Sequence, residues 1–127
     1  MKTLSWAGLL IGLAILASPA SDSVIDAADL EALRAAAGTE VKVAGHVVDI
    51  GTTSDNRITF LNLSLPKKQG FTAVIFEENY GAFPDGFAQF KGQKVEVSGV
   101  IDLFRGNLPQ IKLRSPDQIR ILEASTE

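Results

Sequence analysis

The residues that could carry out catalysis are few, and their spacing does not suit it. The sequence contains one histidine, His46, and no cysteine, so it offers neither thiolate chemistry nor a cluster of histidine metal ligands. Glu77 and Glu78 are neighbours at the predicted end of a strand, where their carboxylates diverge instead of forming the facing pair that glycoside hydrolysis needs. Asp49 and Asp55 lack the spacing of a calcium-binding loop. We therefore expect no enzyme, no metal site and no cofactor.

Aromatic, amide and cationic side chains favour non-covalent binding instead. Phe60 alternates with Leu61 and Leu63 in a predicted strand, so its ring faces away from theirs. An outward aromatic ring can stack on a nucleic-acid base, which contributes roughly 1–3 kcal/mol per base. The predicted ligand-binding residues are Arg57, Phe60, Asn62, Phe71, Phe104, Arg105, Gln110 and Lys112.

Within this set, three kinds of contact are expected. The phenylalanines would stack, the amides of Asn62 and Gln110 would form hydrogen bonds, and the cations would form a basic rim together with Lys67, Lys68 and Arg114. An ordinary solvated surface is the alternative interpretation of the same charges, and the sequence leaves both open.

Strands must position these residues, and the first one organises the chain. Within Thr39–Ile50, valines alternate with more polar residues until Gly45 interrupts the pattern, which indicates a strand with a bend or bulge. A similar pattern recurs 54 residues later as Val95-Glu-Val-Ser-Gly-Val-Ile, in which Gly99 is the matching glycine. Two long strands that bend at a central glycine are typical of a small closed barrel.

The remaining patterns predict further strands at 57–63, 71–76, 93–104 and 108–113, a last short strand at Ile119–Ile121, a helix within 21–37 and a short helix within 79–91. This order predicts an all-β fold with minor α content: a five-stranded Greek-key OB-fold barrel, with an N-terminal helix and a helix between the third and fourth strands. We assign residues 21–37 to the N-terminal helix and residues 38–123 to the OB-fold domain.

The segments that carry a resemblance are Phe60-Leu-Asn-Leu, Phe71-Thr-Ala-Val-Ile, Gly92-Gln-Lys-Val-Glu-Val-Ser-Gly, Pro109-Gln-Ile and Pro116-Asp-Gln-Ile. From Gly38 to about Ile121 the chain resembles small exported bacterial OB-fold proteins and, more broadly, the OB-fold nucleic-acid-binding group that includes tRNA anticodon-binding domains. In those relatives an aromatic matching Phe60 stacks on a base, and a polar residue on the neighbouring strand reads the edge of that base. The position that matches this reader is Ala73.

The first twenty residues have the pattern of a secretory signal peptide, with Lys2 before an uncharged apolar run and small residues at Ser18-Pro19-Ala20. We therefore expect residues 1–20 to be removed and the protein to be exported, periplasmic or secreted. A retained anchor is the alternative. Loss of Lys2 leaves 11 of the 12 basic residues against 15 acidic ones, a net charge of −4.

This net negative charge argues against a dedicated nucleic-acid binder, because such proteins usually have a surplus of basic residues. Two hypotheses follow. The first is an exported OB-fold module that binds single-stranded nucleic acid or another oligomeric or anionic ligand. The second is a structural or protein-interaction domain of the cell envelope that binds no nucleic acid.

Overall fold

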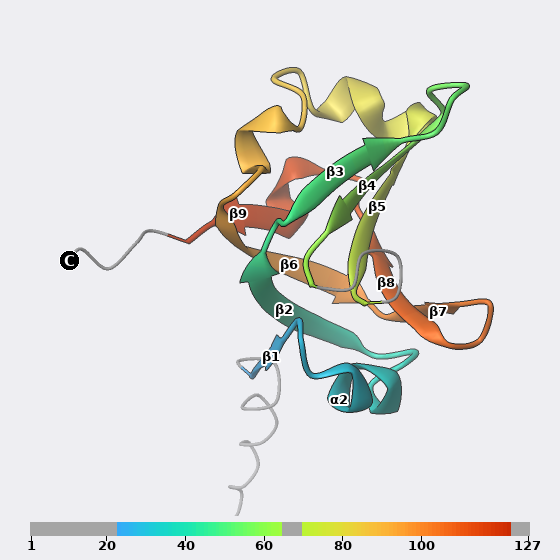
Figure 1. Ribbon diagram of the computed structural model, residues 1–127, viewed down its shortest axis with the longest axis vertical. Coiled ribbons are helices and arrows are strands. Elements are labelled where there is room, and N and C mark those ends of the chain that lie inside the picture. The colour runs from blue at the N-terminus through green and yellow to red at the C-terminus, as the bar shows by residue number, and fades with distance from the viewer. Residues whose placement is uncertain (1–22, 65–69, 123–127) are drawn as a thin grey trace, which may run out of the picture.

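A computed structural model describes residues 23–64 and 70–122 of the protein. This part of the chain is mostly β-structure and forms two sheets (Figure 1). The strands are β1 (Val24–Asp26), β2 (Glu40–His46), β3 (Asp49–Thr52), β4 (Ile58–Asn62), β5 (Thr72–Phe76), β6 (Lys94–Val100), β7 (Asp102–Phe104), β8 (Leu108–Lys112) and β9 (Ile119–Ile121). One sheet has the order β1-β2-β6-β9, and the other has the order β3-β4-β5-β8-β7.

The repeat seen in the sequence pairs with itself in the first sheet. Strands β2 and β6 are antiparallel, with Val43 opposite Val97 at the centre of the register. Because these two valines occupy equivalent positions of the repeat, Gly45 and Gly99 lie on either side of this central pair. Both valines are fully buried. The two repeat strands are therefore related by a local two-fold axis at this pair, and together they form one side of the core.

Each repeat glycine stands where a larger residue would collide with a neighbour. A Cβ at Gly45 would lie 2.6 Å from the Cβ of Ala27, and a Cβ at Gly99 would lie 2.7 Å from Cγ2 of Ile111. Gly99 also has a φ of +150°, a conformation that L side chains rarely adopt. The strands break two residues beyond each glycine, at Val47 and Ile101, where the chain passes from one sheet to the other.

The expectation of a single closed barrel is not met by the backbone ladders. In the described residues no ladder joins β6 to β8, so the pairings leave two sheets that are linked where β2 leads into β3 and β6 into β7. The side chain of Gln118 fills this seam. Its Oε1 accepts a hydrogen bond from the N–H of Arg114 at 2.7 Å, and its Nε2 donates to the C=O of Lys112 at 2.9 Å and of Ser98 at 3.0 Å.

These contacts have a simple physical meaning. In a parallel ladder, one residue bonds to the C=O before and the N–H after the residue opposite it. The Gln118 carboxamide makes that pair of bonds on either side of Leu113, and its second N–H reaches β6. One amide thus replaces a missing strand residue and connects the two sheets.

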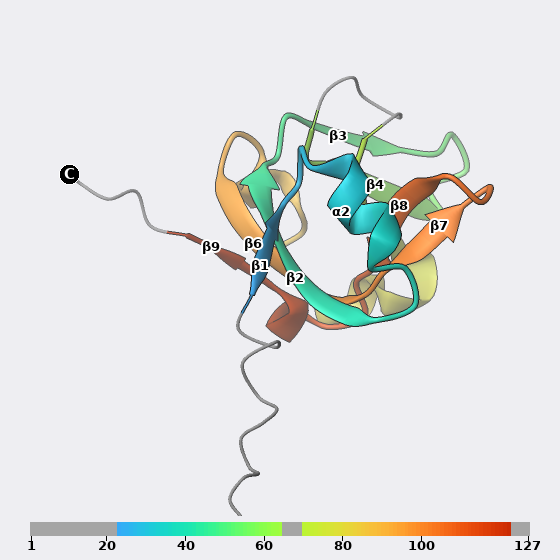
Figure 2. The same ribbon diagram turned by 90° about the horizontal axis from the view of Figure 1, so that it is seen from below.

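The helical segments differ from those expected. The predicted 21–37 helix is shorter, α2 (Leu30–Ala35), and is preceded by strand β1, which pairs in parallel with β2. Its N-cap is Asp29, whose side chain accepts a hydrogen bond from the N–H of Ala32 at 3.2 Å. Figure 2 shows α2 lying across the end of the space that the strands surround. None of the described helices is long and apolar enough to cross a membrane.

The predicted 79–91 helix is replaced by two 3-10 segments, η4 (Glu77–Ala82) and η5 (Ala88–Phe90), at the opposite end of the strands (Figure 1). Phe83 and Phe90 of this region are buried in the core. The hydroxyl of Tyr80 lies 2.9 Å from that of Thr59, which ties η4 to β4.

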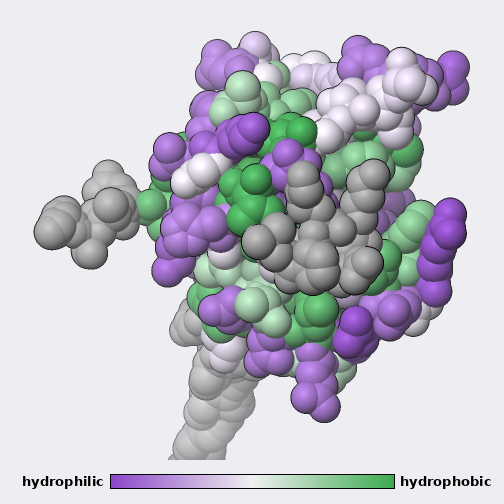
Figure 3. Space-filling model, viewed as in Figure 1, coloured by the Kyte–Doolittle hydropathy of each residue, from purple (hydrophilic) through white to green (hydrophobic). Residues whose placement is uncertain are grey.

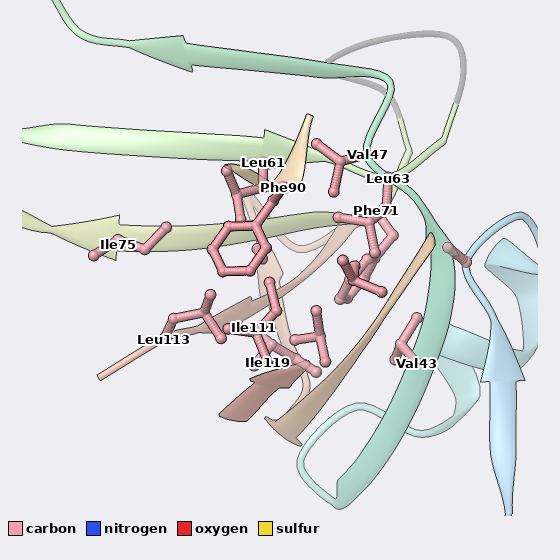
Figure 4. Packing of buried hydrophobic residues seen from close by; sticks show 14 of the residues in the cluster. Val43, Val47, Leu61, Leu63, Phe71, Ile75, Phe90, Ile111, Leu113 and Ile119 are labelled. Atoms are coloured by element: carbon pink, nitrogen blue, oxygen red, sulfur yellow. The ribbon is translucent and has the colours of Figure 1, made fainter. Parts of the chain in front are cut away.

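The core lies between the two sheets, and Figure 4 shows its side chains converging from both of them. Leu61 and Phe71 come from one sheet, Val43 from the other, and all three are fully buried. Phe71, which the sequence predicts as a ligand-binding residue, is fully buried in the core. Its side chain points the same way as those of Ala73 and Ile75, which are also fully buried, so the alternation of the strand directs it inward.

Candidate ligand-binding face

The second sheet turns one side toward the core and the other away from it. Ala73, Ile75 and Ile111 are fully buried on the inner side. The opposite parity defines what we call the outer sheet face, formed by Ile58, Phe60 and Asn62 of β4, Thr72, Val74 and Phe76 of β5, and Gln110 and Lys112 of β8. Phe60 is half-buried while its neighbour Leu61 is fully buried. The parity predicted from the sequence for Phe60 therefore agrees with the structure.

The strand register arranges polar side chains in one row across all five strands. Asp49 lies opposite Asn62, Asn62 opposite Thr72, Thr72 opposite Gln110, and Gln110 opposite Asp102. We call these five residues the polar row. The hydroxyl of Thr72 donates to Oδ1 of Asn62 at 3.1 Å. Asn62 is only 5% exposed, so its amide is largely used within the sheet, whereas Gln110 is half-buried and Asp102 is exposed.

An apolar row runs beside the polar row. Gly51, Phe60, Val74 and Lys112 lie opposite one another on successive strands. Gly51 gives β3 no side chain in this row, and nothing lies within 4 Å of where its Cβ would stand. The Nζ of Lys112 lies 5.2 Å from the centre of the Phe76 ring, in cation–π range. The accessible apolar groups of the face are therefore the half-buried rings of Phe60 and Phe76, since Val74 is only 2% exposed.

The cationic rim expected from the sequence is largely neutralised at Arg57. The Nε of this arginine lies 3.9 Å from a carboxylate oxygen of Asp55 and 3.9 Å from one of Glu77. Hydrogen bonds from the Thr53 hydroxyl at 2.6 Å and from the N–H of Arg57 at 3.2 Å hold the pKa of the Asp55 carboxyl below its ordinary value. Arg57 thus spreads its charge over two carboxylates at the edge of the face.

Phe104 and Arg105 stand together at the turn between β7 and β8. Phe104 is 47% exposed, and the guanidinium carbon of Arg105 lies 5.1 Å from the centre of its ring. The turn is attached to α2, because Nε of Arg34 donates to the C=O of Asn107 at 2.9 Å. This pair offers an exposed ring and a cation, but at the far end of the sheet from Phe60.

The structure thus brings together part of the predicted set. Phe60, Asn62, Gln110 and Lys112 share the outer sheet face, Arg57 lies at one edge, and Phe104 and Arg105 lie at another. Phe71 belongs to the core. Lys67 and Lys68 lie outside the described residues.

Sequence reasoning missed several members of the face. Thr72, Val74 and Phe76 belong to it, whereas Ala73, the position matched to a polar reader, faces the core. These three residues have the parity opposite to that of Phe71, Ala73 and Ile75. The continuous apolar run of this strand hid that alternation.

Comparisons with known proteins leave the family open. No protein-family model matches the chain, and no curated protein matches it. Among solved structures, an "OBody AM1L10 bound to hen egg-white lysozyme" matches with a TM-score of 0.48 and 20% identity, covering 72% of this chain and 86% of that one. An aspartyl tRNA synthetase from Entamoeba histolytica matches with a TM-score of 0.48 and 16% identity, covering 73% of this chain and 20% of that one.

Proposed function

We propose that the protein is a non-catalytic binding module with the OB fold, and that the outer sheet face is its ligand surface. The fold assignment is supported by the order of pairing. Taking β2 with β3 as strand one and β6 with β7 as strand four, the sheets pair as one-two-three-five-four, and β2–β6 links strand one to strand four. Strands three and five are parallel, and the others are antiparallel. A partly open five-stranded Greek-key barrel has this description.

The observation that carries the function is the half-buried ring of Phe60, placed in the apolar row directly beside the polar row. A flat ring next to amide and hydroxyl groups fits a ligand that is itself flat and has polar edges. Successive bases of a single strand satisfy both requirements, since the bases stack on aromatic rings and their edges form hydrogen bonds. We therefore propose single-stranded nucleic acid as the first ligand to test.

The charges on this face limit how such a ligand would bind. Carboxylates end the polar row at Asp49 and Asp102, and Arg57 already lies near two carboxylates. Lys112 lies beside the half-buried Phe76 and Arg105 beside the exposed Phe104. With about two phosphates neutralised, log Kd should change with log salt concentration by a slope of about 1.4, a shallow dependence for a nucleic-acid binder.

A second candidate function is protein interaction in the cell envelope. It is favoured by the exposed apolar residues Val100 and Phe104, which are 53% and 47% exposed, and by the net negative charge. Both candidate functions include the proposal that the protein is exported. It rests on the signal-like pattern of residues 1–20, which lie outside the described part of the chain, and it predicts a secreted protein that starts at Ser21.

The test is a titration of the isotope-labelled protein with oligothymidylate, followed through backbone amide resonances at two salt concentrations. The proposal expects shifts concentrated on β4, β5 and β8, with affinity that falls modestly as salt rises. Shifts confined to the β6–β7 connection, or no shifts at low salt, would reject single-stranded nucleic acid as the ligand of this face. The absence of binding would favour the protein-interaction candidate.

A further inference from the structure

A groove of about 910 Å³ lies at the seam between the two sheets and extends beyond the outer sheet face, with which it shares Asp102 and Lys112. Three segments form its walls: the connection from α2 into β2, the bend from Gly99 to Leu103, and the end of β8 together with Gln118. We call it the seam groove. Its volume is in the range of small-molecule sites. It meets the outer sheet face at Lys112 and Asp102, and Phe60 does not line it.

The seam groove is lined by two acidic and two basic side chains, which come from different segments. Glu40 comes from β2 and Asp102 from β7, whereas Lys112 and Arg114 come from β8 and the residues that follow it. Within residues 23–64 and 70–122, none of these four takes part in an ion pair. A groove lined by two carboxylates and two cations, none of them in an ion pair, suits a ligand that carries both signs of charge, although Lys112 also contacts the Phe76 ring.

A backbone group adds a further contact. Pro109, opposite Leu103, has no N–H, so the paired hydrogen bonds between β7 and β8 belong to the pairs Asp102–Gln110 and Phe104–Leu108. The N–H of Leu103 therefore points away from β8, and no turn or loop hydrogen bond of the described residues uses it. Leu103 lines the seam groove. The groove thus offers a backbone donor of the kind that a peptide carbonyl or carboxylate accepts.

We infer that the seam groove binds a short peptide or peptide-like zwitterion. Its ammonium group lies against Glu40 and Asp102, and its carboxylate lies against Lys112 and Arg114 and accepts from the N–H of Leu103. Gly99 lines the groove beside Ile111 and Gln118. A Cβ at this position would stand 2.7 Å from Cγ2 of Ile111 and 3.1 Å from Nε2 of Gln118. The Gln118 amide is fully used by backbone groups, so it supports the groove and leaves ligand contacts to the charged residues.

The test uses triglycine as the probe, because this tripeptide has both charges and no side chains. Titration of the labelled protein should shift the amide resonances of Gly38, Gly99 and Leu103. Two matched probes isolate each charge: N-acetyl-triglycine keeps only the carboxylate, and triglycine amide keeps only the ammonium group. Both should bind more weakly than triglycine.

Variants then test each wall separately. Arg114→Gln and Asp102→Asn should each weaken triglycine binding by roughly two- to fivefold, the effect of removing one solvent-accessible charge contact of up to about 1 kcal/mol. Arg120→Gln and Asp85→Asn remove the same charges elsewhere on the surface and should leave the affinity unchanged. Glu96 is the partner of Arg120, at 3.1 Å, so the melting temperature of that control is measured as well.

Three results would overturn the inference: no shifts at the seam groove, equal binding of N-acetyl-triglycine and triglycine, or equal effects of the groove variants and their controls. The inference does not depend on the proposed function, and Arg114→Gln separates the two because Arg114 lines only the seam groove, whereas Asp102 and Lys112 belong to both surfaces. Loss of oligothymidylate binding at the outer sheet face with triglycine binding intact would reject the proposed function alone, and the reverse result would reject the seam groove alone.

Discussion

Replacement of Gln118 tests whether one side chain joins the two sheets. We expect Gln118→Met, which keeps the length of the side chain and removes its polar atoms, to destabilise the protein strongly. Three hydrogen bonds to backbone groups are lost, those to Arg114, Lys112 and Ser98. At about 0.5–1.5 kcal/mol each, the sum is about 1.5–4.5 kcal/mol. At 4–8 °C per kcal/mol for a domain of about 100 residues, that lowers the melting temperature by roughly 6–36 °C.

The assay is thermal and urea unfolding of Gln118→Met beside two comparison variants. Gln89→Met is the matched control, because Gln89 is exposed and its side chain makes one hydrogen bond, to the C=O of Gly86 at 3.0 Å. It should change stability by less than about 0.5 kcal/mol. Gln118→Glu keeps an acceptor for Arg114 but loses both donated bonds, so its stability should fall at least as far as that of Gln118→Met. Equal stability of Gln118→Met and Gln89→Met would refute the conclusion that the Gln118 side chain joins the two sheets.

Two further predictions concern stability. Gly99→Ala should cost about 2–4 kcal/mol in urea unfolding, because its Cβ would lie 2.7 Å from Ile111 and the φ of +150° is strained for alanine; an unchanged unfolding midpoint would show that β6 bends elsewhere. Hydrogen bonds from Thr53 and Arg57 lower the pKa of Asp55, so the stabilisation they provide is complete above the ordinary value of 3.8 and is lost as the pH falls through the lower folded value. Asp55→Asn should therefore be less stable than the wild type at neutral pH and approach it below about pH 3.8, and a stability difference that stays constant across this range would contradict that assignment.

Much of the strand pattern could be predicted from the sequence, because most strands have one buried and one solvated side. The alternation around Val43 and its repetition around Val97 identify two equivalent strands, and these prove to be each other's partners. The turn at Ser115 was also predictable, since its side chain caps the 3-10 segment at Pro116–Gln118 by accepting from the N–H of Asp117 at 3.1 Å. Local sequence determines such features.

Features that depend on distant partners could not be predicted in the same way. Strand β1 is three residues long and is held by its pairing with β2, which sequence periodicity does not register. The role of Gln118 depends on three backbone groups from other segments. The closed barrel was expected because nothing local indicates that β6 and β8 diverge at this seam.

The candidate site also combines features that the local sequence predicts with features that depend on distant segments. The outward position of Phe60 follows from the parity of Leu61 and could be predicted, whereas Phe71 and Val74 lie in a continuous apolar run in which parity is hard to assign. The polar row could not be predicted, because it exists only once the register of five strands is known. The sequence likewise gives no sign that Arg57 lies between Asp55 and Glu77.

The central claim is that the outer sheet face binds ligand through Phe60, and Phe60→Ala tests it most directly. Because the ring is half-buried, its removal should cost less stability than Leu61→Ala, for which about 2–5 kcal/mol is expected at a fully buried site. Phe87→Ala is the matched aromatic control, since Phe87 is also half-buried but packs against Tyr80 and Phe83 at centroid distances of 5.9 and 5.1 Å.

The measurement is the affinity of the wild type, Phe60→Ala and Phe87→Ala for fluorescently labelled oligothymidylate at low salt, with each variant shown to be folded. We predict that Phe60→Ala weakens binding by at least about fivefold, the loss of roughly 1 kcal/mol or more of stacking, and that Phe87→Ala binds as the wild type does. Equal affinity of Phe60→Ala and the wild type, or no binding by the wild type, would contradict the claim.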